Sequence, residues 1–279
     1  ARYAGRESTP GTVAMILDAG GDVNSTNNDG WSALLHAARY SRHESSEGAV
    51  IELLGRGASI EQADINGWTA LMHAARYSQS DSTVETANML LDAGANINAQ
   101  NVDRWTPLMH AARYSGEESS EEMIRILLAR GANVDLQDVN GWTALMHAAR
   151  YTGHESTELT VRLLLDAGSS VNIKNTEGWT ALSHAARYSG RESTDGTVAL
   201  LIAAGADVDV QDINGWSPLM FAARCTVTDS SEQTLHALLN AGANIHLRNR
   251  ENNTALSLAS AHVAAGSSWN AVQIISHAI

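Results

Sequence analysis

The stretch from Gly141 to Gly168, "GWTALMHAARYTGHESTELTVRLLLDAG", contains two short segments with helical character. The first, "TALMHAARY", is rich in alanine and leucine and apolar on one side, which favours a helix. The second, "STELTVRLLLDAG", begins with Ser and Thr, which cap helix N-termini, and ends in glycine, which often follows a helix C-terminus. We therefore predict two consecutive helices with a short turn between them.

Close copies of this stretch recur along the chain at a fixed spacing. The tryptophan recurs every 37 residues without insertion or deletion, at Trp31, Trp68, Trp105, Trp142, Trp179 and Trp216. Such a constant period is typical of a solenoid, in which each unit buries its apolar face against its neighbours. We predict a single array over residues 1–279, with a partial unit 1–30 and a divergent capping unit 253–279. The full units between them are 31–67, 68–104, 105–141, 142–178, 179–215 and 216–252.

The segment that joins one unit to the next has the features of an extended turn. In "ANVDLQDVNGW", Val134 and Leu136 alternate with polar residues, and the run from Asp138 to Gly141 has the composition of a tight turn. The predicted fold class is all-α, with stacked helix-turn-helix units joined by β-hairpin-like turns. Capping-box sequences, in which the serine is the helix N-cap, begin at Ser82, Ser119 and Ser230.

The repeated unit resembles the ankyrin repeat. The family pattern D-x-x-G-x-T-P-L-H-x-A is matched by the run from Asp138 to Ala148, and V-x-L-L-L-x-x-G by the run from Val161 to Gly168. The period here exceeds the usual period of about 33 residues, which places a short extension between the two helices of each unit. Methionine also takes the place of the family histidine, and the histidine follows one residue later, as His147.

The resemblance implies an ankyrin-repeat solenoid that binds a protein partner through its concave groove and loop tips. In the family, the residue before T-P-L and the two residues after A-A usually face the concave groove that holds partners. Here these positions hold tryptophan, arginine and tyrosine, which are typical of interface hot spots. Their repetition favours stacking between units, while contact with a partner stays open as the alternative. Together with His154 at a loop tip, the candidate contact residues are Trp68, Tyr77, Trp105, Tyr114, Trp142, Tyr151, Trp179 and Tyr188.

The repeated histidine and arginine are interpreted as structural. The histidine slot holds Phe221 in a later unit, which indicates a buried packing position. Each arginine is followed five residues later by an acid, and both are lost together in the last unit. Because a guanidinium group matches a carboxylate, we predict an ion pair within each unit that folds the extension onto the first helix. The predicted pairs are Arg39 with Glu44, Arg76 with Asp81, Arg113 with Glu118, Arg150 with Glu155 and Arg187 with Glu192.

Composition narrows the function classes. The chain has 44% apolar and 18% charged residues, which is typical of a folded protein. Its net charge of −13 opposes binding to nucleic acid or an anionic membrane, and it favours a protein partner with a basic patch. The single cysteine, Cys225, indicates a reducing compartment. We expect a monomer in the cytoplasm, or in a host-cell cytoplasm if the source is a virus or an effector-producing bacterium.

The sequence contains no motif that indicates catalysis. It has no phosphate-binding G-x-x-x-x-G-K-[S/T] loop, no nucleophile elbow and no zinc-ligand spacing. We therefore expect a non-catalytic interaction scaffold with no cofactor and no metal. Two alternatives stay open. One is a binder of a periodic polyanion or single-stranded nucleic acid that uses the Arg/Tyr/Trp ladder. The other is a targeting segment of a larger enzyme.

Overall fold

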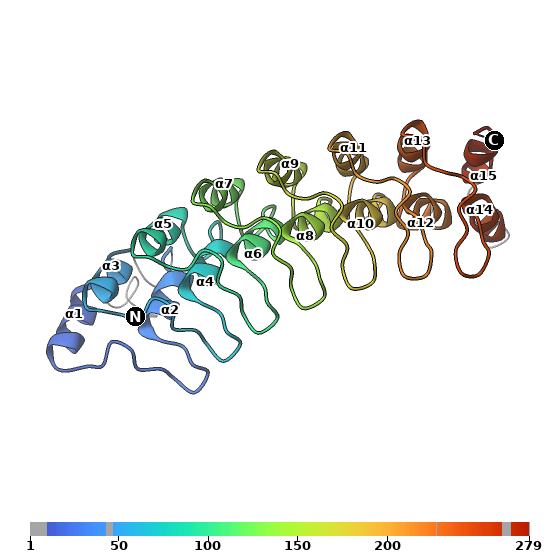
Figure 1. The fold of residues 1–279 in the computed structure, drawn as a ribbon. Coiled ribbons are helices and arrows are strands. Elements are labelled where there is room, and N and C mark those ends of the chain that lie inside the picture. Colours follow the sequence, from blue (N-terminus) through green and yellow to red (C-terminus); the bar gives the residue numbers. More distant parts are fainter. Residues whose placement is uncertain (1–9, 43–46, 227, 264–268, 279) are drawn as a thin grey trace. The chain divides into compact units, whose positions relative to one another are not determined.

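Short helices alternate with turns and loops along the chain (Figure 1). The computed structural model describes residues 10–42, 47–226, 228–263 and 269–278. These residues form fifteen helices and no strand, apart from one isolated bridge between Thr26 and Ser32. The predicted all-α repeat fold is confirmed. By its contacts the chain divides into two compact units, Ala1–Val139 and Asn140–Ile279, and each is described by itself.

In the first compact unit, the helices form two layers (Figure 1). The first helices of the repeats make one layer: α2 (Ala33–Arg39), α4 (Ala70–Arg76) and α6 (Pro107–Arg113). The second helices make the other: α1 (Pro10–Asp18), α3 (Glu47–Gly55), α5 (Val84–Asp92) and α7 (Glu121–Ala129). Within this unit, α2, α4 and α6 pack on α3, α5 and α7 of the same repeats, and successive helices of each layer pack on one another.

The second compact unit has the same two-layer arrangement. The first helices are α8 (Ala144–Tyr151), α10 (Ala181–Tyr188), α12 (Pro218–Cys225) and α14 (Ala255–Val263). The second helices are α9 (Glu158–Asp166), α11 (Asp195–Ala203), α13 (Glu232–Asn240) and α15 (Trp269–Ser276). The helices predicted from the stretch that begins at Gly141 correspond to α8 and α9.

Alanine and leucine side chains form the core. In α8, Leu145 is 1% exposed and both Ala148 and Ala149 are 0% exposed. The small alanines allow neighbouring first helices to approach closely, and the leucines fill the space around them. Since burial of one leucine side chain stabilises the fold by about 1.5–3 kcal/mol, repetition of this pattern gives every repeat a similar stabilising contribution.

The first helices begin where a threonine or serine caps them. Thr69 accepts the backbone N–H of Met72, and Thr143 accepts that of Met146. For the second helices, the predicted capping residues were wrong by one position. The N-caps are Thr83, Ser120 and Ser231 rather than the serines that precede them.

The preceding serines have a different role. The Ser82 hydroxyl donates to the carbonyl of Ala38 at 2.6 Å, and the Ser119 hydroxyl donates to that of Ala75 at 2.7 Å. Both acceptors are in the first helix of the preceding repeat, and both serines are 0% exposed. Because a buried hydroxyl requires a hydrogen-bond partner, each serine fixes its loop to the preceding helix instead of capping its own.

The hairpins are joined to one another through their backbones. The N–H of Ile65 donates to the carbonyl of Asp29 at 3.1 Å, and the N–H of Val102 donates to that of Asn66 at 3.1 Å. A residue with positive φ closes each turn. Glycine holds this place at Gly67, with φ 78°, whereas Arg104 holds the equivalent place with φ 61°. An L-amino acid other than glycine is strained in this conformation.

The Arg104→Gly substitution is expected to raise the free energy of unfolding by about 1 kcal/mol, because it relieves this strain. Urea denaturation would measure the change. Arg104→Ala is the matched control, since it removes the same side chain but keeps the Cβ atom. An equal gain in both variants would show that the benefit comes from loss of the side chain and not from the backbone.

Candidate functional site

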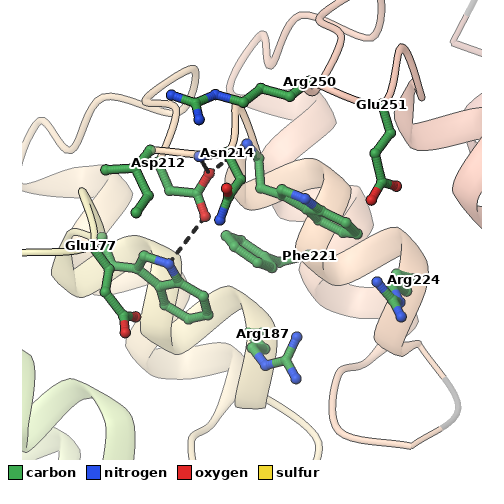
Figure 2. Close-up of a pocket in the computed structure, with 11 residues that line it drawn as sticks. Glu177, Arg187, Asp212, Asn214, Phe221, Arg224, Arg250 and Glu251 are labelled. Atoms are coloured by element: carbon green, nitrogen blue, oxygen red, sulfur yellow. Dashed lines mark hydrogen bonds between the residues drawn. The ribbon is translucent and has the colours of Figure 1, made fainter.

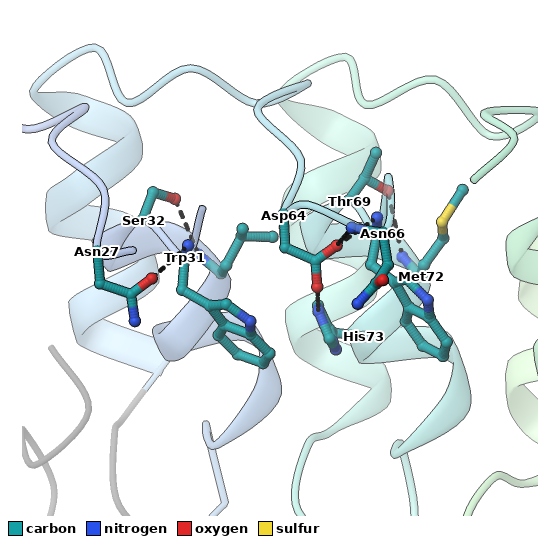
Figure 3. Close-up of polar contacts among 10 residues, drawn as sticks. Asn27, Trp31, Ser32, Asp64, Asn66, Thr69, Met72 and His73 are labelled. Carbon is teal, nitrogen blue, oxygen red and sulfur yellow. Dashed lines mark hydrogen bonds and ion pairs between the residues drawn. The ribbon is translucent and has the colours of Figure 1, made fainter. Parts of the chain in front are cut away.

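The tryptophans are positioned by an asparagine or aspartate in the preceding hairpin (Figure 3). The Asn27 side-chain oxygen accepts the backbone N–H of Trp31 at 2.9 Å, and one Asp64 carboxylate oxygen accepts that of Trp68 at 2.9 Å. This bond fixes the point at which the chain enters the first helix. The slot alternates strictly between the two residue types, as Asn27, Asp64, Asn101, Asp138, Asn175, Asp212 and Asn249. The sequence prediction missed this alternation.

Four tryptophans each lie between rings of two successive repeats: Trp31, Trp68, Trp142 and Trp179. In the first compact unit, the ring of Trp68 is 5.0 Å from that of His73 in its own repeat and 4.0 Å from that of His110 in the next. In the second, Trp142 is 4.0 Å from His184. Such ring pairs add about 0.5–1.5 kcal/mol beyond area burial. The tryptophans therefore contribute to packing between repeats while one part of each side chain stays exposed.

Four of the repeated histidines are buried, as predicted for a packing position, and His36 is half-buried. His73 is 5% exposed and His184 is 2% exposed. Burial lowers the pKa of His73, and it lowers the pKa of His184 well below the usual value, so both rings are neutral near pH 7. His73 Nε2 lies 3.8 Å from a carboxylate oxygen of Asp64 (Figure 3). Burial acts to raise the pKa of Asp64, but the His73 ring and the N–H groups of Trp68 and Asn66 lower it overall.

The arginines also join successive repeats. The guanidinium carbon of Arg76 is 3.6 Å from the ring centre of Tyr114 in the next repeat, and that of Arg150 is 3.8 Å from Tyr188. A guanidinium group over an aromatic ring is attracted by the ring electrons. The candidate tyrosines are half-buried for this reason. His154, by contrast, is exposed on its loop.

Three arginines form ion pairs with the acid of the next repeat and not within their own repeat. Arg39 pairs with Asp81 at 3.0 Å, Arg76 with Glu118 at 2.9 Å, and Arg150 with Glu192 at 2.9 Å. The pairings of Arg76 with Asp81, Arg113 with Glu118 and Arg187 with Glu192 are thus incorrect, because each of these acids contacts the arginine of the preceding repeat. Glu44 lies outside the described residues, and the side chains of Arg113 and Glu155 are half-buried.

The backbone explains this register. The carbonyl of Asp81 accepts the N–H of Arg42 at 3.0 Å, and the carbonyl of Glu192 accepts the N–H of Gly153 at 2.9 Å. Within each compact unit, these extensions are therefore hydrogen-bonded to the extension of the preceding repeat. This bond brings the carboxylate next to the preceding arginine and away from the arginine of its own first helix.

Stability measurements can test the pairing. We expect Arg76→Ala and Glu118→Ala to be non-additive by about 0.5–1 kcal/mol, the coupling of a partly exposed ion pair. Arg76→Ala and Asp81→Ala are the matched control and should be additive. Coupling of Arg76 to Asp81 in place of Glu118 would contradict the pairing between repeats.

A pocket in the second compact unit lies between two first helices and the hairpins beside them (Figure 2). Its volume is about 510 Å³. Trp179, Trp216 and Phe221 supply its aromatic wall, and Trp179 Nε1 donates to an Asp212 carboxylate oxygen at 3.2 Å. The other lining residues are Glu177, Arg187, Ile213, Asn214, Arg224, Arg250 and Glu251.

The hairpin tips next to this pocket, and those of the first compact unit, expose large apolar side chains. Ile213 is 52% exposed, and Ile65 and Val102 are 66% and 62% exposed. None of these was among the predicted contact residues. Their signal in the sequence was an aliphatic residue in a turn that is otherwise polar. Exposed apolar side chains beside a pocket are typical of interaction surfaces.

Neither a metal centre nor a membrane span is found in the part of the chain that the structure describes. Within residues 10–42, 47–226, 228–263 and 269–278, no three His, Cys, Asp or Glu side chains are grouped so that they could hold a metal ion. No helix among these residues is both long enough and apolar enough to cross a bilayer.

Comparison with known proteins agrees with the architecture. No curated protein matches the chain. A family model that describes three copies of the ankyrin repeat matches in overlapping segments, at residues 3–101, 45–138, 80–175, 108–195, 152–249 and 191–277. Ankyrin repeats are generally protein–protein interaction modules, and proteins built from them are typically non-enzymatic scaffolds. With paired helices, linking hairpins and a family match over nearly its whole length, this chain belongs to the ankyrin repeat family.

Proposed function

We propose that the chain is a non-catalytic scaffold that binds a protein partner between its hairpins and its first helices. The observation that carries this proposal is the pocket beside α10 and α12, whose wall consists of two tryptophans and a phenylalanine with arginines at its edge. Tryptophan and arginine are enriched among the residues that dominate interface energies. The exposed side chain of Ile213 extends this surface onto the hairpin tip.

Preorganisation supports the same function. Trp179 is held by ring contacts with His184 at 4.9 Å and with Phe221 at 4.3 Å, and by its hydrogen bond to Asp212. A side chain that is already fixed loses little conformational entropy when a partner binds. The candidate tryptophans and tyrosines would thus act as a rigid surface, with their exposed edges and His154 in contact with the partner.

The charge of the chain indicates the kind of partner. A net charge of −13 favours a partner with a basic patch and an association that weakens as salt is added. We propose that the chain acts as a monomer in the cytoplasm. The arginine ladder gives little support to polyanion binding, since Arg39, Arg76 and Arg150 are each paired with a carboxylate.

Affinity capture with two matched variants tests the proposal. Ile213→Lys places a charge on the hairpin tip, whereas Leu159→Lys places the same charge on α9 in the second-helix layer, where Leu159 is 40% exposed. A protein captured by the unmodified chain should be lost with Ile213→Lys and retained with Leu159→Lys, with both variants folded by circular dichroism. Equal retention by both variants, or no specific capture by the unmodified chain, would contradict the proposal.

A further inference from the structure

The arginine near the end of each first helix, such as Arg39, Arg76 and Arg150, forms different contacts at Arg187, beside the pocket. In the regular repeats the guanidinium group is covered by the tyrosine of the next repeat and neutralised by its acid, as Arg150 is by Tyr188 and Glu192. Cys225 replaces that tyrosine for Arg187, and Arg187 Nη1 lies 3.7 Å from the Cys225 sulfur. Burial raises the pKa of the Cys225 thiol, so the thiol is neutral and does not compensate the arginine charge.

The acid at the equivalent position, Asp229, interacts electrostatically with Arg187 but forms its ion pair with another arginine. Asp229 is equivalent to Glu192 in the preceding repeat, but its carboxylate forms an ion pair with Arg191 at 3.4 Å. The guanidinium carbon of Arg187 lies 5.2 Å from the ring centre of Tyr188 in its own repeat, and 6.0 and 5.9 Å from those of Trp179 and Phe221, which line the pocket. Arg39, Arg76 and Arg150 instead have their closest ring contacts with the tyrosine of the next repeat, at 2.9, 3.6 and 3.8 Å.

Arg224 is the next member of the ladder and has no acid to pair with in the following repeat. The position equivalent to Asp229 in that repeat is Gly266, which has no carboxylate. Arg224 is exposed, and its guanidinium carbon lies 5.2 Å from the Trp216 ring on the pocket wall. Figure 2 shows Arg187, from α10, and Arg224, from α12, apart from each other among the residues that line the pocket.

The acids that line the pocket do not neutralise these two arginines. Asp212 is held by the N–H groups of Asn214 and Trp216 at 2.8 and 2.7 Å, and by Trp179 Nε1. Glu177 and Glu251 are exposed on the hairpin tips. Among the described residues, neither of these glutamates forms an ion pair with Arg187 or Arg224. Within the part of the chain that the structure describes, neither Arg187 nor Arg224 forms an ion pair, and both lie beside the aromatic wall of the pocket.

We infer that this pocket binds a carboxylate of the partner protein, an Asp or Glu side chain next to an apolar residue, between Arg187 and Arg224. This inference rests on the proposed function and names the chemistry of the segment that would be recognised. A guanidinium fork matches the two oxygens of a carboxylate. The wall formed by Trp179, Phe221 and Trp216 would hold the neighbouring apolar side chain. Glu177 and Glu251 at the rim oppose a continuous polyanion and leave room for one carboxylate.

Peptide selection tests the inference without knowledge of the partner. Random peptides displayed on phage would be selected against the intact chain, and an enriched peptide would be labelled and titrated by fluorescence polarisation. The expected result is enrichment of sequences with an acid beside an apolar residue. Arg224→Gln and Arg187→Gln should each weaken binding roughly tenfold, which is the loss of a charge-assisted hydrogen bond. Arg162→Gln on α9 is the matched control and should bind as the unmodified chain does.

A change in the peptide tests whether its acid is the group that binds Arg224. Replacement of the acid in the peptide by the corresponding amide should weaken its binding to the unmodified chain. The same replacement should have little further effect on binding to the Arg224→Gln variant. Because Arg224 is exposed, this variant should fold normally. Enriched peptides without an acid, or affinities unaffected by both arginine variants, would overturn the inference. So would a labelled oligonucleotide that binds through the same two arginines. If Ile213→Lys still abolishes partner capture in these cases, the proposed function stands and only the inference fails.

Discussion

Replacement of Gly141 by alanine is expected to lower the free energy of unfolding by about 2–3 kcal/mol. Gly141 has φ 78°, and a Cβ atom at this position would lie 2.9 Å from the backbone nitrogen of Thr176 and 3.0 Å from Cα of Asn175. The substitution therefore combines conformational strain with a contact against backbone, which can be relieved only if the next hairpin moves. Urea denaturation of the two proteins would measure the loss.

Gly168→Ala separates the two causes. Gly168 has φ 86° in the same compact unit, but a Cβ atom there would meet nothing within 4 Å. This control should cost only about 1 kcal/mol, from strain alone. Equal losses in the two variants would show that the close approach of successive hairpins is not limiting. The presence of Arg104 in the slot equivalent to Gly141 indicates that a hairpin can accommodate a Cβ atom, at a cost in stability.

A second large effect is expected on acidification. The unfolded histidine has a pKa of about 6.5, whereas burial lowers the pKa of His184 well below this value in the folded chain. As the pH falls below about 6.5, the unfolded state takes up a proton that the folded state does not. Above this pH, His184 does not make the free energy of unfolding depend on pH. Below it, His184 lowers the free energy of unfolding by up to about 1.4 kcal/mol per pH unit, until the pKa of the folded state is reached.

His184→Phe should remove this part of the acid sensitivity. Phenylalanine is accommodated at the equivalent place in the next repeat, where Phe221 lies 4.3 Å from Trp179. Urea denaturation at neutral pH and about one unit below the histidine pKa would compare the variant with the unmodified chain. His154→Gln, which removes an exposed histidine, is the control. Parallel loss of stability in the unmodified chain and in His184→Phe would contradict a role for this ring.

The repeat fold could be predicted because period, helix ends and turn residues all pointed to the same unit. The partners of the arginines could not, for a reason that belongs to regular repeats. With a period of 37 residues, an acid five residues after an arginine in one repeat implies an acid 42 residues after it in the next. The arginine and the acid are kept together and lost together along the sequence, and this fits pairing within a repeat as well as pairing with the next repeat. Only the backbone bonds between successive extensions, such as Gly153 to Glu192, decide between them.

The candidate site was predicted in part. The residue types at the tryptophan, arginine and tyrosine positions were clear from the sequence, but stacking and partner contact require the same side chains. The geometry shows that one tryptophan can stack between repeats and still expose part of its side chain. The change from tyrosine to Cys225 was visible in the sequence. The effect of this change on Arg187 depends on its distances to Trp179 and Phe221 and on the ion pair between Asp229 and Arg191. The sequence pattern does not show either.

The alternation of asparagine and aspartate in the hairpins bears on how such an array can grow. Where the first turn position is Asn, as at Asn101, the position two residues later is an acid, Asp103; where it is Asp, as at Asp64, that position is Asn66. Neighbouring hairpins thus never place two acids at the same level, which would be unfavourable. Duplication or deletion of a single repeat would create such a pair. The unit that recombination, or a protein engineer, can copy without penalty is two repeats.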